Sequence, residues 1–176
     1  MWRKLDPYIP EAAKIRWDTV EFTRGLGYDI GCGSEKVWPH AIGIDNRKDT
    51  GLFNIQMNPD LTVPDASDLS RLIVSGQADW VFSSHLLEHI EFENVPKALK
   101  EWWRLLRSGG YLTLYLPDED EYPKVGEDGA NPDHKWNVNY DKIIEAMKPL
   151  GSWDLVEFQK RNQDNEYSLF FVFKKV

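Results

Sequence analysis

The sequence has a single cysteine, no long apolar run and fewer basic than acidic residues. With Cys32 alone, an intrachain disulfide is excluded. No apolar run approaches the roughly 18–20 residues that a membrane span needs, and residues 1–7 lack the apolar region of a signal peptide. The 21 Lys and Arg against 29 Asp and Glu give a net charge of −8, which disfavours general nucleic-acid binding, since that affinity comes largely from neutralised phosphates. We therefore expect a cytoplasmic protein without a nucleic-acid or membrane partner.

The length and composition fit one globular domain. The chain has 176 residues, of which 41% are hydrophobic, enough for a core and within the usual size of one domain. No internal repeat or low-complexity tract divides it. We therefore predict a single domain spanning residues 1–176.

Short apolar strands alternate with helices along the chain, a pattern typical of an α/β sheet. Residues 94–107 give the clearest helix, with apolar residues at helical spacing and a glycine pair at the end. A helix over 11–24 is also expected, although residues 20–23 alternate as in a strand. Two closing strands can pair as an antiparallel hairpin at the sheet edge. The other predicted elements are strands at 27–30, 41–45, 78–83, 111–116, 153–159 and 167–174, and a helix at 140–149.

A glycine-rich turn follows the first predicted strand, at residues 29–34. Gly31 and Gly33 allow the backbone to pass close to a ligand, and the N–H groups of a following helix would suit a carboxylate or phosphate. This turn predicts a ligand site, although two glycines alone are weak evidence.

Asp45 ends the next predicted strand, where an acidic side chain can accept hydrogen bonds from both hydroxyls of a ribose. A dinucleotide fingerprint would need a third glycine at position 36, which is Lys36, and a full helix before the second strand. Residues 34–40 leave room for about one helical turn, with Pro39 inside it. An NAD site therefore fits poorly, and a different nucleotide-containing ligand fits better.

Two later segments add polar groups to the same expected site. An acidic side chain next to free backbone N–H groups, as at Asp65, can bind an adenine edge. The strand at 78–83 runs into a polar segment with Ser84, His85, Glu88 and His89, and ligands in open α/β sheets lie outside the carboxyl ends of strands.

Together these motifs resemble the class I S-adenosylmethionine-dependent methyltransferases, of the type 11 kind with a shortened first helix. The similarity runs over residues 27–176 and rests on five motifs in the family's order. They are DIGCGS at 29–34, GID at 43–45, DASDL at 65–69, ADWVFSSHLLEH at 78–89 and LLRSGGYL at 105–112. The resemblance implies a three-layer Rossmann-like sandwich with a mostly parallel seven-stranded sheet.

The resemblance also implies which residues bind S-adenosylmethionine. Gly31, Cys32, Gly33 and Ser34 would line its methionine part, and Asp29 would orient the turn and the amino group. Asp45 and the adjacent Asn46 would bind the ribose, Asp65 and Ala66 the adenine, and Ser83 and Ser84 would face the sulfonium and the acceptor. Simple turn capping is the alternative role for Asp29 and Ser83.

Methyl transfer to a hydroxyl needs a group that takes up the proton, and histidine suits that role at neutral pH. His85 is the first candidate because it follows the strand end directly. His134, in the acidic segment, is the second. Either residue can instead be a satisfied polar residue of a helix start or a loop.

The spacing of His85, Glu88 and His89 also matches an inverted zinc-protease motif. That motif belongs inside a long helix, whereas here it follows a buried strand, so a protease is disfavoured. A divalent metal beside the acceptor hydroxyl is a milder alternative, which some methyltransferases resembling this one use; our working expectation contains no metal.

The expected acceptor is a small molecule or a sugar, methylated at a hydroxyl rather than an amine. The strand end lacks the motif of amino-directed DNA methyltransferases, and the acidic segment disfavours polyanions. Only residues 1–24, as an N-terminal cap, and 117–139, as a substrate-side loop, are available to cover the acceptor, so a homo-oligomer is possible. The alternatives are an inactive cofactor-binding module and, less favoured, an NAD-using enzyme.

Overall fold

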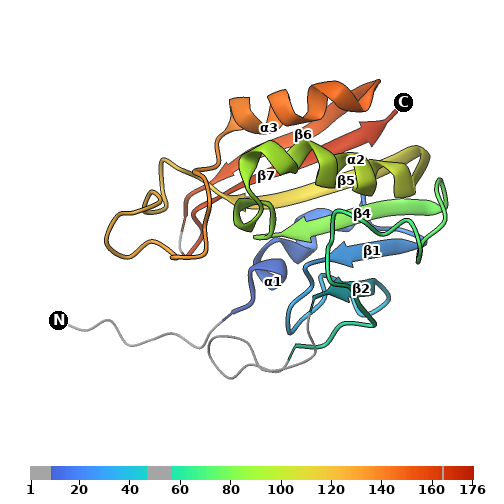
Figure 1. Ribbon diagram of the computed structural model, residues 1–176, viewed down its shortest axis with the longest axis horizontal. Coiled ribbons are helices and arrows are strands. Elements are labelled where there is room, and N and C mark those ends of the chain that lie inside the picture. Colours follow the sequence, from blue (N-terminus) through green and yellow to red (C-terminus); the bar gives the residue numbers. More distant parts are fainter. Residues whose placement is uncertain (1–8, 47–56, 164) are drawn as a thin grey trace.

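A seven-stranded mixed sheet forms the centre of the computed structural model, which describes residues 9–46, 57–163 and 165–176. The strand order is β3-β2-β1-β4-β5-β7-β6 (Figure 1). Neighbours from β3 to β5 pair in parallel, and β7 pairs antiparallel with both β5 and β6. The strands are β1 (Gly27–Ile30), β2 (Ile42–Asp45), β3 (Leu61–Thr62), β4 (Ala78–Ser84), β5 (Leu106–Pro117), β6 (Trp153–Arg161) and β7 (Ser168–Lys175). The predicted α/β fold, with its antiparallel C-terminal hairpin, is confirmed.

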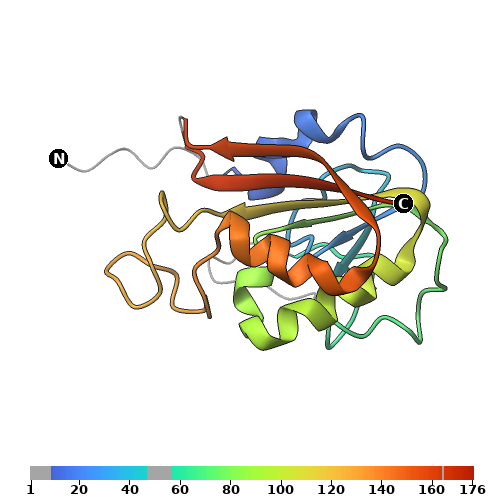
Figure 2. The same ribbon diagram turned by 90° about the horizontal axis from the view of Figure 1, so that it is seen from above.

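Helices cover the two faces of the sheet unequally. Helices α2 (Val95–Leu105) and α3 (Tyr140–Met147) lie along one face, as Figure 2 shows. The short α1 (Glu11–Ile15) and the 3-10 helix η1 (Arg16–Thr19) lie on the other. Three further single turns are η2 (Leu87–His89), η3 (Phe92–Asn94) and η4 (Lys148–Leu150). None of the described helices is long and apolar enough to cross a membrane.

Alternation along the central strands builds a separate core on each face. In β4, Val81 belongs to the larger cluster beneath α2 and α3, whereas its neighbours Trp80 and Phe82 belong to the smaller cluster beneath α1. This follows from the strand period of two residues. Ile15 and Val37 cover the smaller cluster on the side away from the sheet, and both are fully buried.

Two predicted helices are corrected by the structure. The helix expected over 11–24 ends at Thr19, where the Thr19 hydroxyl bonds the Arg16 carbonyl and tightens the chain into a 3-10 turn. Residues 34–40 form bends and turns without a helix, because Val37 enters the core there and its N–H donates to the Asp29 carboxylate.

The helix predicted over 94–107 ends two residues earlier than expected, at Leu105. Leu106 already pairs with Ala78 as the first residue of β5, and an irregularity in the ladder follows. Glycine is needed at position 110 in this irregular part of the ladder, because a Cβ there would lie 2.9 Å from the Asp79 carbonyl oxygen. Its lack of a side chain therefore fits strand packing. The two-residue strand β3 and the irregular stretch 63–77 were not predicted, because neither carries a periodic pattern.

Candidate functional site

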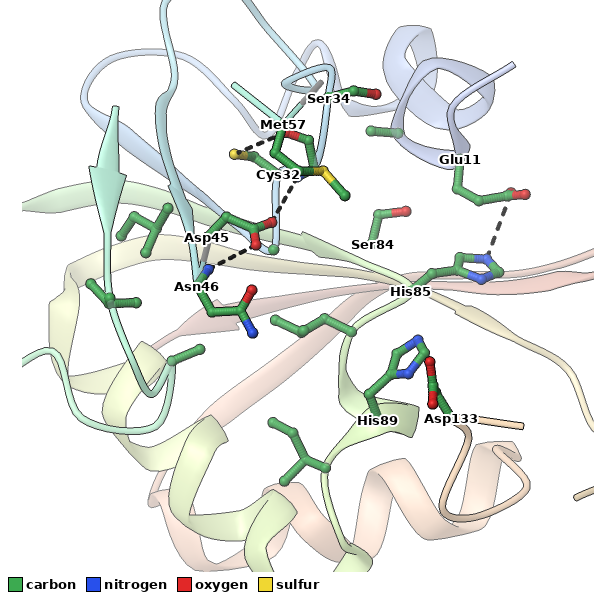
Figure 3. Close-up of a pocket in the computed structure, with 18 of the residues that line it drawn as sticks. Glu11, Cys32, Ser34, Asp45, Asn46, Met57, Ser84, His85, His89 and Asp133 are labelled. Atoms are coloured by element: carbon green, nitrogen blue, oxygen red, sulfur yellow. Dashed lines mark hydrogen bonds and ion pairs between the residues drawn. The ribbon is translucent and has the colours of Figure 1, made fainter. Parts of the chain in front are cut away.

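A cavity of about 680 Å³ lies at the carboxyl ends of the parallel strands β1, β2 and β4 (Figure 3). This edge is where open α/β sheets bind ligands, and the volume suits a small molecule. The predicted cofactor residues in its wall are Gly31, Cys32, Gly33, Ser34, Asp45, Asn46, Asp65, Ala66 and Ser84.

The turn after β1 brings the backbone to the cavity. Gly31 and Gly33 have φ angles of 77° and 57°, in the region that favours glycine. The N–H groups of Gly31 and Cys32 both donate to the Ile44 carbonyl, at 2.8 and 3.2 Å, so the turn is fixed against β2. A Cβ at Gly31 would lie 2.8 Å from the Leu86 side chain. The turn is therefore a pre-formed cradle that a larger residue would fill.

Asp45 lies beside this cradle with both carboxylate oxygens held by the backbone. One oxygen accepts the Gly33 N–H at 2.9 Å and the other accepts the Asn46 N–H at 2.7 Å. Each oxygen keeps a further acceptor site, and the side chain lines the cavity. This donor set fits a pair of ribose hydroxyls.

The part of the cavity next to the cradle and Asp45 is mostly apolar. Ile44, Val63, Ala66 and Leu86 line it, which suits the faces of an aromatic base. Asp65 stands at its rim, where its carboxylate accepts the Ser67 N–H at 2.7 Å and hydrogen bonds from Ser67 hold its pKa below the usual range. The residues present therefore fit the adenosine part of the expected cofactor.

Three predicted site residues do not reach the cavity wall. Ser83 is fully buried and donates to the Ile30 carbonyl at 2.8 Å, since side chains alternate along β4 and Ser84 takes the cavity position. Asp29 is buried behind the turn, where it accepts the Val37 N–H, and burial raises its pKa to about 7. His134, also buried, is separated from the main cavity and borders a small one. Ser83 and Asp29 therefore lie behind the cavity wall, in the capping roles given as their alternative.

The other half of the cavity carries proton-accepting groups. His85 follows β4 in a left-handed conformation, with φ of 48°, and its Nε2 lies 3.0 Å from the Ser168 hydroxyl. Glu11, from α1, lines the same region, and its Oε2 lies 3.7 Å from His85 Nε2 (Figure 3). Its other oxygen accepts from Lys14 at 2.7 Å and from the Tyr167 hydroxyl at 2.9 Å. Sequence reasoning missed Glu11, which no motif marks.

Both segments expected to cover the acceptor contribute to the wall. Pro10, Glu11 and Ala12 come from the predicted N-terminal cap, whose residues 1–8 lie outside the described residues. Asn131, Asp133 and Lys135 come from the predicted substrate-side loop.

A buried carboxyl group with three imidazoles around it lies at the edge of this half. Glu88 is fully buried, and neither of its carboxylate oxygens has a hydrogen-bond partner among the described residues. Its Oε1 lies 3.6 Å from His85 Nδ1, 3.9 Å from His89 Nε2 and 3.7 Å from His134 Nε2. Burial raises the pKa of Glu88 to about 8 and lowers those of His85 and His134 to about 3 and 4. Without a bound cation, these contacts join neutral groups.

Comparisons with known proteins agree with this arrangement. A family model described as a methyltransferase domain matches residues 28–114, whereas no curated protein matches the sequence. The chain is similar to a SAM-dependent methyltransferase structure from Archaeoglobus fulgidus, at 16% identity and a TM-score of 0.65, covering 93% of this chain and 92% of that chain. It is also similar to SAM-dependent methyltransferases from Methanosarcina mazei (15%, TM-score 0.61, 90% and 97% covered) and Mesorhizobium loti (12%, TM-score 0.64, 93% and 98% covered). At these identities the structural likeness establishes the fold, and the family model connects that fold to methyl transfer.

Proposed function

The chain belongs to the class I S-adenosylmethionine-dependent methyltransferases, and from this premise we propose that it methylates a hydroxyl group of a small molecule or a sugar. The observation that carries the proposal is the pair of Glu11 and His85 in the half of the cavity beyond the cofactor cradle. Their facing atoms, Oε2 and Nε2, are 3.7 Å apart, and Glu11 Oε2 has no hydrogen bond within the described part of the chain. A hydroxyl that contacts both atoms from the cavity would meet a carboxylate oxygen able to take its proton.

When bound, S-adenosylmethionine supplies a methyl group on a positively charged sulfur, already activated for transfer. The residues of the chain then have to hold the acceptor oxygen in line and remove its proton as the new bond forms. Ser84 directly precedes His85 and lines the cavity with a buried hydroxyl that has no hydrogen-bond partner among residues 9–46, 57–163 and 165–176. It can orient the acceptor, while the Glu11 carboxylate receives the proton and His85, whose pKa burial lowers to about 3, serves as a neutral hydrogen-bond partner.

The outer wall supports a polar, uncharged acceptor. Asn131, Asp133 and Lys135 line it with an amide, a carboxylate and an ammonium group, so donors and acceptors of hydrogen bonds alternate there. A sugar or a polyhydroxylated small molecule presents matching groups, whereas a polyanion would meet the acidic segment 117–135.

The first experiment is calorimetric titration with S-adenosylhomocysteine. Asp45→Ala removes both backbone hydrogen bonds and the ribose acceptor, so we expect at least about a tenfold loss of affinity, the value of one lost charge-assisted hydrogen bond. Asp154→Ala is the matched control, because Asp154 is exposed on β6. Equal affinities for the two variants would contradict the assigned ribose site.

The acceptor is tested by incubating the enzyme with panels of sugars, phenols, alcohols and amines and measuring S-adenosylhomocysteine formation. We expect hydroxyl acceptors to be methylated, and Glu11→Gln to lower kcat by about 100-fold or more, as loss of a proton acceptor does. Glu91→Gln, at an exposed residue, is the control. Turnover of amines alone, or a Glu11→Gln variant with unchanged kcat, would refute the proposal.

A further inference from the structure

Glu88, His89 and His134 form a cluster that the methyl-transfer scheme leaves unexplained. Each offers one ligand atom, and the three atoms lie within 4.8 Å of one another. Glu88 is fully buried, and within the described part of the chain its partners at ion-pair range are imidazoles only. A buried carboxyl group with two unpartnered oxygens is costly, and each such group needs a physical explanation.

We propose that Glu88, His89 and His134 bind a divalent transition-metal ion, with Zn²⁺ as the cation that best matches them. Two imidazoles and one carboxylate are the donor set of many zinc sites with an open coordination position. Zinc holds such atoms at about 2.0–2.2 Å, so that tetrahedral neighbours lie about 3.4 Å apart. The Glu88 Oε1 distances of 3.7 and 3.9 Å to His134 and His89 need to shorten by only a few tenths of an ångström, and the two imidazoles, whose ligand atoms lie within 4.8 Å of each other, would turn toward the ion.

The backbone holds the two parts of this cluster together. The Lys135 N–H donates to the Glu88 carbonyl at 2.8 Å, and the Trp136 indole N–H donates to the Leu87 carbonyl at 3.1 Å. The segment carrying His134 is therefore fixed against η2, which carries Glu88 and His89. A ligand set held in this way does not have to be assembled by the ion.

His89 has the support expected of a metal ligand. Its Nε2 faces Glu88, and the imidazole lies beside Asp133, whose charge and backbone act on its pKa. Ligating histidines usually donate their second ring N–H to a carbonyl or carboxylate, which fixes the ring and its tautomer. Figure 3 shows His89 and Asp133 side by side at the cavity.

The position of the cluster gives the ion an open side. Glu88 and His134 are buried, whereas His89 lines the cavity together with His85 and Asp133. The ion would therefore have protein ligands behind it and the acceptor half of the cavity in front. If the proposed function holds, a hydroxyl acceptor bound there would lose its proton more easily, because a metal lowers the pKa of a coordinated oxygen.

The test is titration of chelator-treated protein with Zn²⁺, followed by calorimetry, and with Co²⁺, followed by its visible absorption. We expect the protein to bind one equivalent of either ion. Binding should be at least about tenfold weaker in Glu88→Gln and in His134→Asn, since even the loss of a residue that only hydrogen-bonds to a metal ligand typically has an effect of this size. His40→Asn is the matched control, because His40 is exposed and bonds the Thr23 carbonyl away from the cluster. Retained binding of S-adenosylhomocysteine identifies folded variants.

Folded parent protein that takes up neither ion would overturn the site. Glu88 would then be buried as a protonated carboxylic acid without a metal. Equal weakening by the His40 variant would overturn the ligand assignment. Because the titration uses the ion alone, its result does not depend on the methyl acceptor. Protein that binds Zn²⁺ but methylates only amines would refute the proposed function and retain the metal site.

Discussion

Asp29 lies near the end of β1. One of its carboxylate oxygens accepts the Val37 N–H, and the other has no hydrogen bond to any residue that the structure describes. Burial is the main cause that raises its pKa to about 7; Asp45 raises it further, whereas Lys36 and Arg16 lower it. In the unfolded chain the carboxyl group ionises near its ordinary pKa of 3.8. Between these two values the unfolded state is ionised and the folded state is not, so rising pH favours unfolding.

The prediction concerns Asp29→Asn, which keeps an acceptor for Val37 and cannot ionise. The free energy of unfolding of the parent should fall relative to the variant by up to about 1.4 kcal/mol per pH unit as the pH rises toward 7. Above that pH the difference should level off. Urea unfolding of the cofactor-free proteins from pH 5.5 to 8 measures it, with Asp154→Asn as control. Parallel profiles for the parent and Asp29→Asn would contradict a raised pKa.

Single residues were predictable where local chemistry decides their role. Gly31 and Gly33 need positive φ angles, and Asp45 is the last residue of a strand, so the cradle and its acid could be predicted from short motifs. The side-chain directions of Asp29 and Ser83 could not, because they depend on which face of the sheet each strand residue meets. Glu11 could not be found either, since only the packing of α1 against β7 and the sheet brings it to His85.

At the scale of elements, Arg16 holds in place the segment 34–40, which follows β1 and contains no helix. From η1 it donates to the carbonyl groups of Val37 and Lys36, the latter at 3.0 Å, and pairs with Glu35. Its planar guanidinium group reaches three partners along one segment, which a lysine ammonium cannot reproduce. The segment that follows the cradle is thus held by a side chain from another element.

We therefore expect Arg16→Lys to lower the free energy of unfolding by about 1–3 kcal/mol, the range for lost hydrogen bonds to a charged group. Binding of S-adenosylhomocysteine should weaken as well, because the cradle is continuous with this segment. Arg24→Lys, at an exposed position, provides the comparison. Chemical denaturation and calorimetry measure the two effects, and a stable variant with full affinity would show that Arg16 is dispensable.

Elements with a clear period were predictable, and those held by tertiary contacts were not. Helix α2 carries its apolar residues at helical spacing, and the closing strands β6 and β7 have strand-like sequences. Segment 34–40 has no period, and its path depends on burial of Val37 and on Arg16. The boundary between α2 and β5 was missed because Leu106 suits both patterns, and pairing with Ala78 decides between them.

For the whole molecule, the order of motifs carried the prediction further than any motif alone. The cofactor class and the fold followed from five short segments in sequence, and the family match leaves the NAD-using alternative without support. The expectation of a single domain has a structural basis that extends across the sheet. Strands β4 and β5 contribute side chains to both core clusters, so neither cluster can lose its strands without exposing the other.

This continuity predicts one cooperative unfolding transition for residues 1–176. The cofactor cradle lies on β1 and β2, near one edge, while the C-terminal hairpin forms the opposite edge. Because ligand binding stabilises only the folded state, S-adenosylhomocysteine at 100 times its Kd should raise the free energy of unfolding by about 2.7 kcal/mol and move the entire transition to higher temperature. Differential scanning calorimetry with and without ligand, and with Asp45→Ala, checks both points. Two transitions, of which the ligand moves only one, would show that the hairpin region unfolds independently of the cradle and that the chain contains two cooperative units.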